Sequence, residues 1–379
     1  MEDAKPLQLE THLKLRRDLS TVQPSSLTDI WSAAPAGRKI ETCWKFLQAR
    51  YGTGKLSSGE FLQFGFCDPT NADRDITTFA GKQAQQAFNK IYNDKTWYAL
   101  TKNKIAFEML MRGGGMPCPQ TIAIYDRKGR GAGAPVLKTT NALEAFLLSE
   151  DQYPFFCKPT TGLLSIGSFR IDARRENTLI VNATHEYPVA EVIRYIQGLS
   201  PKGYIFQSVL EPHEGFKDIN CTVISSLRFL VLNHEKHAKI HSGVLKVPAQ
   251  GEVADNFWRT GSVIGAIDID SGKLKRAVLK SDTGVTELKK NDPQAKTLFD
   301  FTLPDFEKAK DCVLKGARFM PGVRVQSWDV AITTKGPILL EVNFGGDLNL
   351  WQLSSNTGVM DKDYCEILRE AGFKGRLPH

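Results

Sequence analysis

Two polar residues on one face of a predicted strand, near the C-terminal end, are the first candidates for chemistry. An apolar run at residues 336–340 leads into Glu341, Val342 and Asn343. Side chains two positions apart in a β-strand point to the same face, so Glu341 and Asn343 would present two oxygen ligands side by side. Val342 would point the other way, into a core.

An aspartate lies in the strand predicted just upstream. Residues 323–332 are mostly apolar but contain Asp329, and residues 335–337 (Lys-Gly-Pro) are typical of a turn. If the two strands form a hairpin, Asp329 can lie across from Glu341 and Asn343. Three oxygen donors on one rigid face suit Mg²⁺, which also takes ligands from substrate phosphates. A plain structural turn is the alternative interpretation of the same stretch.

A lysine ends another predicted strand. Lys158 follows the apolar residues 153–157 and precedes Pro159 and a turn at residues 160–168 that is rich in Gly, Ser and Thr. Such a lysine can hold phosphate oxygens while backbone N–H groups of the turn contact the same phosphates. The turn matches neither G-x-x-x-x-G-K-[ST] nor G-x-G-x-x-G. Taken alone, the segment fits a surface lysine before a hairpin better than a phosphate site.

The stretch at residues 207–211 ends a strand and enters a polar turn at residues 212–215. A strand that crosses between two lobes is a natural seat for adenine. Backbone groups would read the purine edge, apolar side chains would sandwich the ring, and a carboxylate would take the ribose hydroxyls. An ordinary strand end is the alternative.

Two further polar residues can be explained either by a ligand site or by an ordinary structural role. Arg228 is a charge inside the apolar stretch at residues 225–232. An unpaired buried charge is costly, so Arg228 must either form a structural salt bridge or face an anion. Asn256 lies in the polar loop at residues 255–262, which ordinary turn chemistry also explains.

The amino-acid composition limits the cellular compartment and the classes of binding partner that we expect for the protein. The 379 residues are 41% hydrophobic and 24% charged, with a net charge of +7 that suits an anionic ligand and equally suits simple solubility. Seven scattered cysteines without a Cys-x-x-Cys motif indicate a reducing compartment. No apolar run approaches a signal peptide or membrane span, and no nucleic-acid motif is present. We therefore expect a cytoplasmic protein that binds neither membrane nor nucleic acid.

The chain changes character near residue 99. Residues 1–30 are polar and are predicted to lie outside the core, and apolar spacing predicts helices within residues 37–51, 57–66 and 79–98. From there, short helices and strands alternate, and the second half is rich in predicted strands, the first of them at residues 219–225. This pattern predicts an α+β or mixed-sheet enzyme.

The order of these residues resembles the ATP-grasp superfamily, most closely its sugar-transfer-associated or alpha-L-glutamate-ligase-related branch. The resemblance covers roughly residues 40–355 and rests on the order and spacing of several stretches, Asp329 and Glu341-Val342-Asn343 above all. It implies an ATP-grasp fold, with two α+β lobes that clasp a nucleotide. The implied divisions are a mainly helical cap at 1–98, an N-lobe at 99–210 and a C-lobe at 211–379.

The resemblance also implies roles for individual residues. ATP would be bound by phosphate-contacting, adenine-framing and ribose-contacting residues: Lys104, Lys158, Gly167, Ser168, Gln207, Val209, Leu210, Glu211 and Glu214. One or two Mg²⁺ ions would be bound by Asp329, Glu341 and Asn343. Arg228 and Asn256 would stabilise an acyl phosphate and the tetrahedral species that follows it.

The implied activity is ligation of a carboxylate to an amine through an acyl phosphate, with release of ADP and phosphate. The partners would be a small-molecule or peptide carboxylate and an amine acceptor, and a homodimer is one option for the assembly. A small-molecule or sugar kinase and a nucleotide-binding regulatory module are the alternatives. The intact set of Lys158, Asp329, Glu341 and Asn343 argues against the regulatory module.

Overall fold

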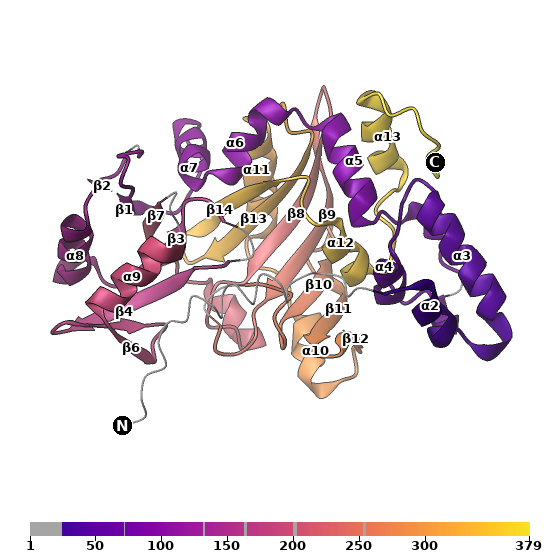
Figure 1. The fold of residues 1–379 in the computed structure, drawn as a ribbon, viewed down its shortest axis with the longest axis horizontal. Coiled ribbons are helices and arrows are strands. Elements are labelled where there is room, and N and C mark those ends of the chain that lie inside the picture. The colour runs from indigo at the N-terminus through magenta and orange to yellow at the C-terminus, as the bar shows by residue number, and fades with distance from the viewer. Residues whose placement is uncertain (1–24, 72, 132, 163–164, 200–202, 253–254) are drawn as a thin grey trace.

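The molecule is built on two seven-stranded sheets, seen in a computed structural model, and the first sheet lies at the left in Figure 1. The structure describes residues 25–71, 73–131, 133–162, 165–199, 203–252 and 255–379. Strands of the first sheet come from residues 121–208, and strands of the second come from residues 226–344. The segment between the sheets, residues 209–225, therefore connects the two.

The first sheet has the strand order β2-β1-β7-β3-β4-β5-β6. Its strands are β1 (Thr121–Tyr125), β2 (Val136–Leu137), β3 (Phe155–Pro159), β4 (Phe169–Arg175), β5 (Thr178–Val181), β6 (His185–Pro188) and β7 (Tyr204–Ser208). All its pairings are antiparallel except that of β1 with β2. Helices α8 (Thr140–Leu148) and α9 (Val189–Leu199) share a hydrophobic core with this sheet.

The second sheet is antiparallel throughout, in the order β12-β11-β10-β9-β8-β13-β14. Its strands are β8 (Ser226–Asn233), β9 (Ala238–Val247), β10 (Val263–Ile267), β11 (Leu274–Ser281), β12 (Gly284–Leu288), β13 (Val325–Thr333) and β14 (Gly336–Phe344). The predicted hairpin is confirmed: β13 and β14 pair so that Asp329 lies opposite Glu341.

Helices cover both faces of the second sheet. On one face lie α10 (Pro293–Asp300) and α11 (Phe306–Ala317), whose core includes Trp328 and residues of α7 (Lys104–Gly113). On the other face lie α12 (Leu348–Ser355), α13 (Lys362–Glu370) and the N-terminal helices. The N-terminal helices are α2 (Leu27–Ala33), α3 (Lys39–Tyr51), α4 (Ser58–Gln63) and α5 (Lys82–Tyr92). The short helix α6 (Tyr98–Lys102) instead packs through Leu100 against the core that contains α7.

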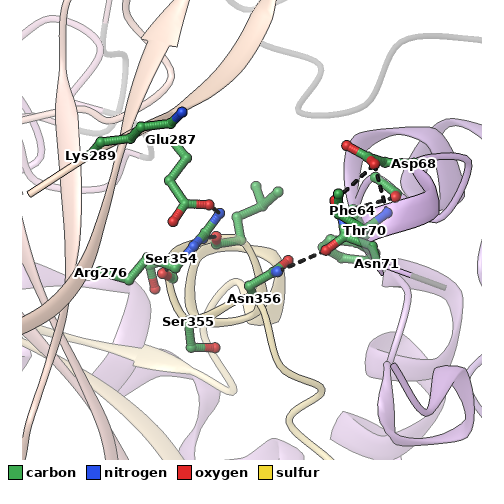
Figure 2. Close-up of polar contacts among 12 residues, drawn as sticks. Phe64, Asp68, Thr70, Asn71, Arg276, Glu287, Lys289, Ser354, Ser355 and Asn356 are labelled. Carbon is green, nitrogen blue, oxygen red and sulfur yellow. Dashed lines mark hydrogen bonds and ion pairs between the residues drawn. The ribbon is translucent and has the colours of Figure 1, made fainter. Parts of the chain in front are cut away.

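The N-terminal helices thus share a hydrophobic core with the C-terminal helices, and α5 lies beside α13 and α12 in Figure 1. At the end of α12, Asn356 donates to Asn71 Oδ1 across 3.1 Å, as Figure 2 shows. Arg276 donates to Glu287 and to the carbonyl oxygens of the last turn of α12. A cation at a helix C-terminus also interacts favourably with the helix dipole.

The predicted pattern of alternating short helices and strands is confirmed, with three differences. The strand predicted at residues 219–225 is wrong, since a 3₁₀ helix, η6 (Glu214–Ile219), ends there and Asn220 has a φ of 54°. Strands β11 and β12 were not predicted. Ile30 is fully buried, so the polar N-terminal stretch reaches the core, whereas residues 1–24 lie outside the described residues. No helix in the described part of the chain is long and apolar enough to span a membrane.

Candidate active site

A cavity of about 1680 Å³ is lined by residues from both sheets and from the segment that connects them. Twelve of the fourteen residues predicted for the site line it: Lys104, Lys158, Ser168, Gln207, Val209, Leu210, Glu211, Arg228, Asn256, Asp329, Glu341 and Asn343. The volume exceeds the usual 300–1,000 Å³ of a ligand pocket, which leaves room for a nucleotide and a second substrate.

Two predicted residues lie elsewhere. Gly167 is buried and does not line the cavity; it has a φ of 78°, and its carbonyl oxygen accepts a hydrogen bond from Tyr204 Oη at 2.5 Å. Glu214 begins η6 with an exposed side chain away from the cavity lining. Gly167 therefore supports the turn through its backbone, and Glu211 is the acidic residue of this segment that lines the cavity.

Arg228 and Asp329 form a buried ion pair at the cavity wall. Their Cα atoms are partners in the pairing of β8 with β13, which places the two side chains on the same face of the sheet. Arg228 donates from Nε to Asp329 Oδ1 at 2.6 Å and from Nη2 to Oδ2 at 2.5 Å. Of the two alternatives for Arg228, the structural salt bridge is present, and it leaves Nη1 outside the bidentate pair.

Lys246 is a charged residue of the site that the sequence reasoning missed. It lies in the apolar strand β9, and its ammonium group is 3.4 Å from Asp329 Oδ1 and 3.3 Å from Asp255 Oδ1. Asp255 also accepts a hydrogen bond from the backbone N–H of Ser226 at 2.8 Å. A lysine within an apolar strand is the same signal that singled out Arg228, and it could have found Lys246.

These charges set the protonation of the two aspartates in opposite directions. Burial alone would raise the pKa of Asp329, but Arg228 and Lys246 outweigh it and hold that pKa well below its ordinary value. Burial raises the pKa of Asp255, which Lys246 opposes and the Asp329 charge reinforces. Asp329 is therefore an anion fixed between two cations.

Lys104, the first residue of α7, lies beside the hairpin of β13 and β14. Its ammonium group is 3.7 Å from Glu341 Oε2, and Asn343 donates from Nδ2 to Glu341 Oε1 at 3.3 Å. The backbone N–H of Lys104 donates to Thr160 O at 3.0 Å, which ties the start of α7 to the turn after β3. Three segments far apart in the sequence thus converge on one wall of the cavity.

Lys158 lies half-buried on β3, on the same cavity wall as Lys104. Burial lowers the pKa of Lys158 to about 8, and the neighbouring Lys104 ammonium lowers it in the same direction, while Glu108 and Glu341 oppose the shift. An incoming anion would favour the charged form of Lys158. The site therefore holds a lysine whose protonation can respond to the ligand.

Gln207 is buried at the end of β7, with Thr121 and Phe156 as its Cα partners on the two neighbouring strands. Its Nε2 donates to Glu108 Oε1, and the Thr121 hydroxyl donates to Glu108 Oε2. Burial raises the pKa of Glu108, which the hydrogen bond from Thr121 opposes. Glu108, from α7, is a second residue of the site that sequence reasoning missed, because nothing local distinguishes it from a surface helix glutamate.

The segment that follows Gln207 is held against the end of β13. The backbone N–H of His213 donates to Ile332 O at 3.0 Å, and that of Thr334 donates to Glu211 O at 3.1 Å. These bonds fix the crossing between the sheets while the side chains of Val209, Leu210 and Glu211 line the cavity. Farther along the wall, Asn256 is buried and accepts the backbone N–H of Trp258 on Oδ1 at 3.2 Å.

The donor set on β14 fits a divalent cation better than the donor on β13 does. Glu341 and Asn343 present oxygens on the cavity wall, and hard oxygen ligands suit Mg²⁺. Both oxygens of Asp329 are already bonded to Arg228. Within the described ranges, no three His, Cys, Asp or Glu side chains converge as a metal cluster. A Mg²⁺ ion here would take most of its remaining ligands from phosphates and water.

Comparison with known families decides the classification. The model of the sugar-transfer associated ATP-grasp family matches residues 83–365. The chain belongs to this ATP-grasp family. Family and fold class, both predicted from the sequence, are thereby confirmed. None of the curated proteins matches this ATP-grasp chain.

Solved structures similar to this ATP-grasp chain include three amino-acid ligases. D-alanine-D-alanine ligase from Helicobacter pylori is 14% identical with a TM-score of 0.39, over 72% of this chain and 60% of that chain. D-alanine-D-alanine ligase from Bacillus anthracis is 12% identical with a TM-score of 0.42, over 77% of both chains. L-amino acid ligase from Bacillus licheniformis is 14% identical with a TM-score of 0.39, over 77% of this chain and 56% of that chain.

Proposed function

We propose that this protein is an ATP- and Mg²⁺-dependent ligase that joins a carboxylate to an amine through an acyl phosphate and releases ADP and phosphate. The observation that carries the proposal is the convergence of Lys104, Lys158, Glu341 and Asn343 on one cavity wall. Two cations beside a carboxylate and an amide oxygen form a site for a phosphate chain and its metal. Membership of an ATP-grasp family supports the same assignment.

Each residue of this wall has a distinct task in the proposal. Lys104 and Lys158 hold the phosphate oxygens and keep the terminal phosphate in line with the attacking carboxylate. Glu341 and Asn343 hold the metal. When bound, Mg²⁺ neutralises the charge that builds up on the phosphates during transfer. Glu341 also keeps Lys104 near the phosphate site through their 3.7 Å ion pair.

Arg228 stabilises the acyl phosphate and the tetrahedral species. Its Nε and Nη2 are bonded to Asp329, so the guanidinium plane is fixed before the substrate arrives and Nη1 donates to the substrate. A preorganised cation costs no reorganisation when charge develops in the transition state. Lys246 holds Asp329 from the other side, and Asn256 borders the same part of the cavity.

The experiment that tests the function measures ADP release with a panel of carboxylates, each with and without a panel of amines. The panel contains amino acids, short peptides and uronic acids. ADP release that requires both a carboxylate and an amine supports the ligase. ADP release that requires only a hydroxyl compound would show a kinase instead. ADP release that exceeds the buffer control when no carboxylate or amine has been added would contradict the proposal.

Glu341→Gln is the matched test of the metal site. The side chain is partly exposed, and its ion pair and hydrogen bond among the described residues are those with Lys104 and Asn343, so we expect the thermal midpoint to change little. Turnover should fall by about 100-fold or more, because loss of one preorganised charged contact typically has that effect. Glu144→Gln, on the exposed face of α8, is the control and should keep full turnover. An active Glu341→Gln variant would exclude this glutamate as a metal ligand.

A further inference from the structure

The side-chain amide of Gln207 is fixed in one orientation by a neighbouring carboxylate. Glu108 is 6% exposed and Gln207 is 2% exposed. One oxygen of Glu108 is bonded to Gln207 Nε2 and the other to the Thr121 hydroxyl. A carboxylate only accepts hydrogen bonds, so the group that Gln207 turns toward Glu108 must be its amino group.

The carbonyl oxygen of Gln207 is consequently directed away from Glu108. Within the described part of the chain, no group donates a hydrogen bond to Gln207 Oε1. This oxygen is also not fully buried. Gln207 also lines the cavity. The oxygen is therefore an acceptor that remains available to a ligand.

The part of the cavity around Gln207 suits a flat ring. Phe156 of β3 is the cross-strand neighbour of Gln207, Val209 and Leu210 follow Gln207 in the chain, and Leu340 of β14 lines the same cavity. A ring held between such side chains gains its orientation from the few polar groups at its edge. Gln207 Oε1 is a polar group of this kind, and it offers an acceptor but no donor.

From this geometry we infer that Glu108 is a positioning residue for base selectivity: it sets Gln207 to accept a hydrogen bond from a 6-amino purine and to reject a 6-oxo purine. The inference rests on the proposed use of ATP. An amino group at C6 donates to Oε1, whereas a carbonyl at C6 would set two acceptors against each other. A site built to bond one partner rejects the analogue that leaves its polar groups unpaired.

Binding of four nucleotides in the presence of Mg²⁺, measured by calorimetry without other substrates, tests the inference. ATP and inosine triphosphate differ at C6, GTP adds a 2-amino group, and purine riboside triphosphate carries no group at C6. The wild-type protein should bind ATP most tightly. In Glu108→Gln, the side-chain amide of Gln207 is no longer fixed and can rotate to present its amino group to the ligand. The dissociation constant for inosine triphosphate divided by that for ATP should therefore fall by about fivefold, which corresponds to one hydrogen bond.

Two further variants separate orientation from structural damage. The exchange of both residues, Glu108→Gln with Gln207→Glu, restores a donor–acceptor pair and an outward-facing acceptor, so it should recover the wild-type ratio. Thr121→Val removes the other partner of Glu108 and should leave the ratio unchanged. An unaltered ratio in Glu108→Gln, or a folded exchange variant without selectivity, would overturn the inference. Wild-type protein that binds none of the nucleotides would overturn the proposed function as well.

Discussion

At the scale of single residues, charged side chains of the site are paired with partners that are distant in sequence. Lys104 pairs with Glu341, Arg228 with Asp329, and Lys246 with both Asp329 and Asp255. Breaking a buried pair from one side leaves an uncompensated charge, which typically costs about 3–5 kcal/mol. The pairs therefore hold the residues in place as well as preparing them for chemistry.

The titration of Lys158 leads to a pH prediction. Burial disfavours the ammonium form, so its cost to folding is fully present below about pH 8 and is relieved as the pH rises from about 8 toward the ordinary lysine pKa of 10.5. Phosphate binding needs the ammonium form, so the affinity for ATP changes with pH in the opposite direction to the stability of the fold. The affinity for ATP should fall as the pH rises through about 8, and calorimetry in buffers of different ionisation enthalpy should detect proton uptake on binding near that pH.

Lys158→Arg provides the comparison. Arginine stays charged across this range, so the variant should bind ATP without proton uptake and with a flatter pH profile. Equal profiles in the two proteins would show that Lys158 is not the titrating group in the nucleotide site.

At the scale of elements, the N-terminal turn of α7 determines where Lys104 lies in the site. Asn103 caps this helix, since its Oδ1 accepts the backbone N–H groups of Ile105 at 2.9 Å and Ala106 at 3.2 Å. Lys104 is the next residue, and Glu108 follows one turn later. One helix therefore positions the phosphate contact and the group that orients Gln207.

Loss of this cap should weaken the nucleotide site. Asn103→Ala leaves two helix N–H groups without a side-chain acceptor, so we expect the free energy of unfolding to fall by about 1 kcal/mol in urea titrations. The dissociation constant for ATP should rise at the same time. Asn103→Asp retains the cap and should keep both quantities near the wild-type values; a wild-type affinity in Asn103→Ala would show that the cap does not aim Lys104.

The sequence predicts local geometry well and distant contacts poorly. The hairpin that sets Asp329 opposite Glu341 follows from strand alternation and a turn signal at residues 335–337, both of them local features. The turn itself falls at Thr334 and Lys335, and Gly336 and Pro337 already belong to β14. The contact of Gln207 with Glu108 joins residues 99 positions apart, and no periodicity specifies it. Lys246 could have been singled out as a charge within an apolar strand, but its two acidic partners lie on other segments and no local pattern names them.

At the scale of the whole molecule, the N-terminal helices and the C-terminal helices form one core against the second sheet. Tyr92 in α5 and Tyr364 in α13 are both buried, and their hydroxyl oxygens are 3.0 Å apart. The sequence predicted these helices as a mainly helical N-terminal cap. Amphipathic spacing shows that one face of a helix is buried but does not show which element buries it. The site wall and this core share the second sheet.

This shared core predicts cooperative unfolding. Phe88 in α5 is 1% exposed and packs edge-to-face on Phe373 with ring centroids 5.5 Å apart. Phe88→Ala should lower the free energy of unfolding by about 3–5 kcal/mol through the cavity that it leaves. Tryptophan fluorescence and far-ultraviolet circular dichroism should report one coincident transition. Separate transitions by the two probes would indicate that the N-terminal helices fold on their own.

The central claim is that a carboxylate attacks the terminal phosphate of ATP in the cavity between the two sheets. The most direct measurement uses the carboxylate that supports ADP release, labelled with ¹⁸O at both oxygens of its carboxyl group, and mass spectrometry of the released phosphate. Transfer of the carboxyl oxygen through an acyl phosphate predicts one ¹⁸O atom in each phosphate released. Phosphate without the label, formed at the same rate as ADP, would contradict the account.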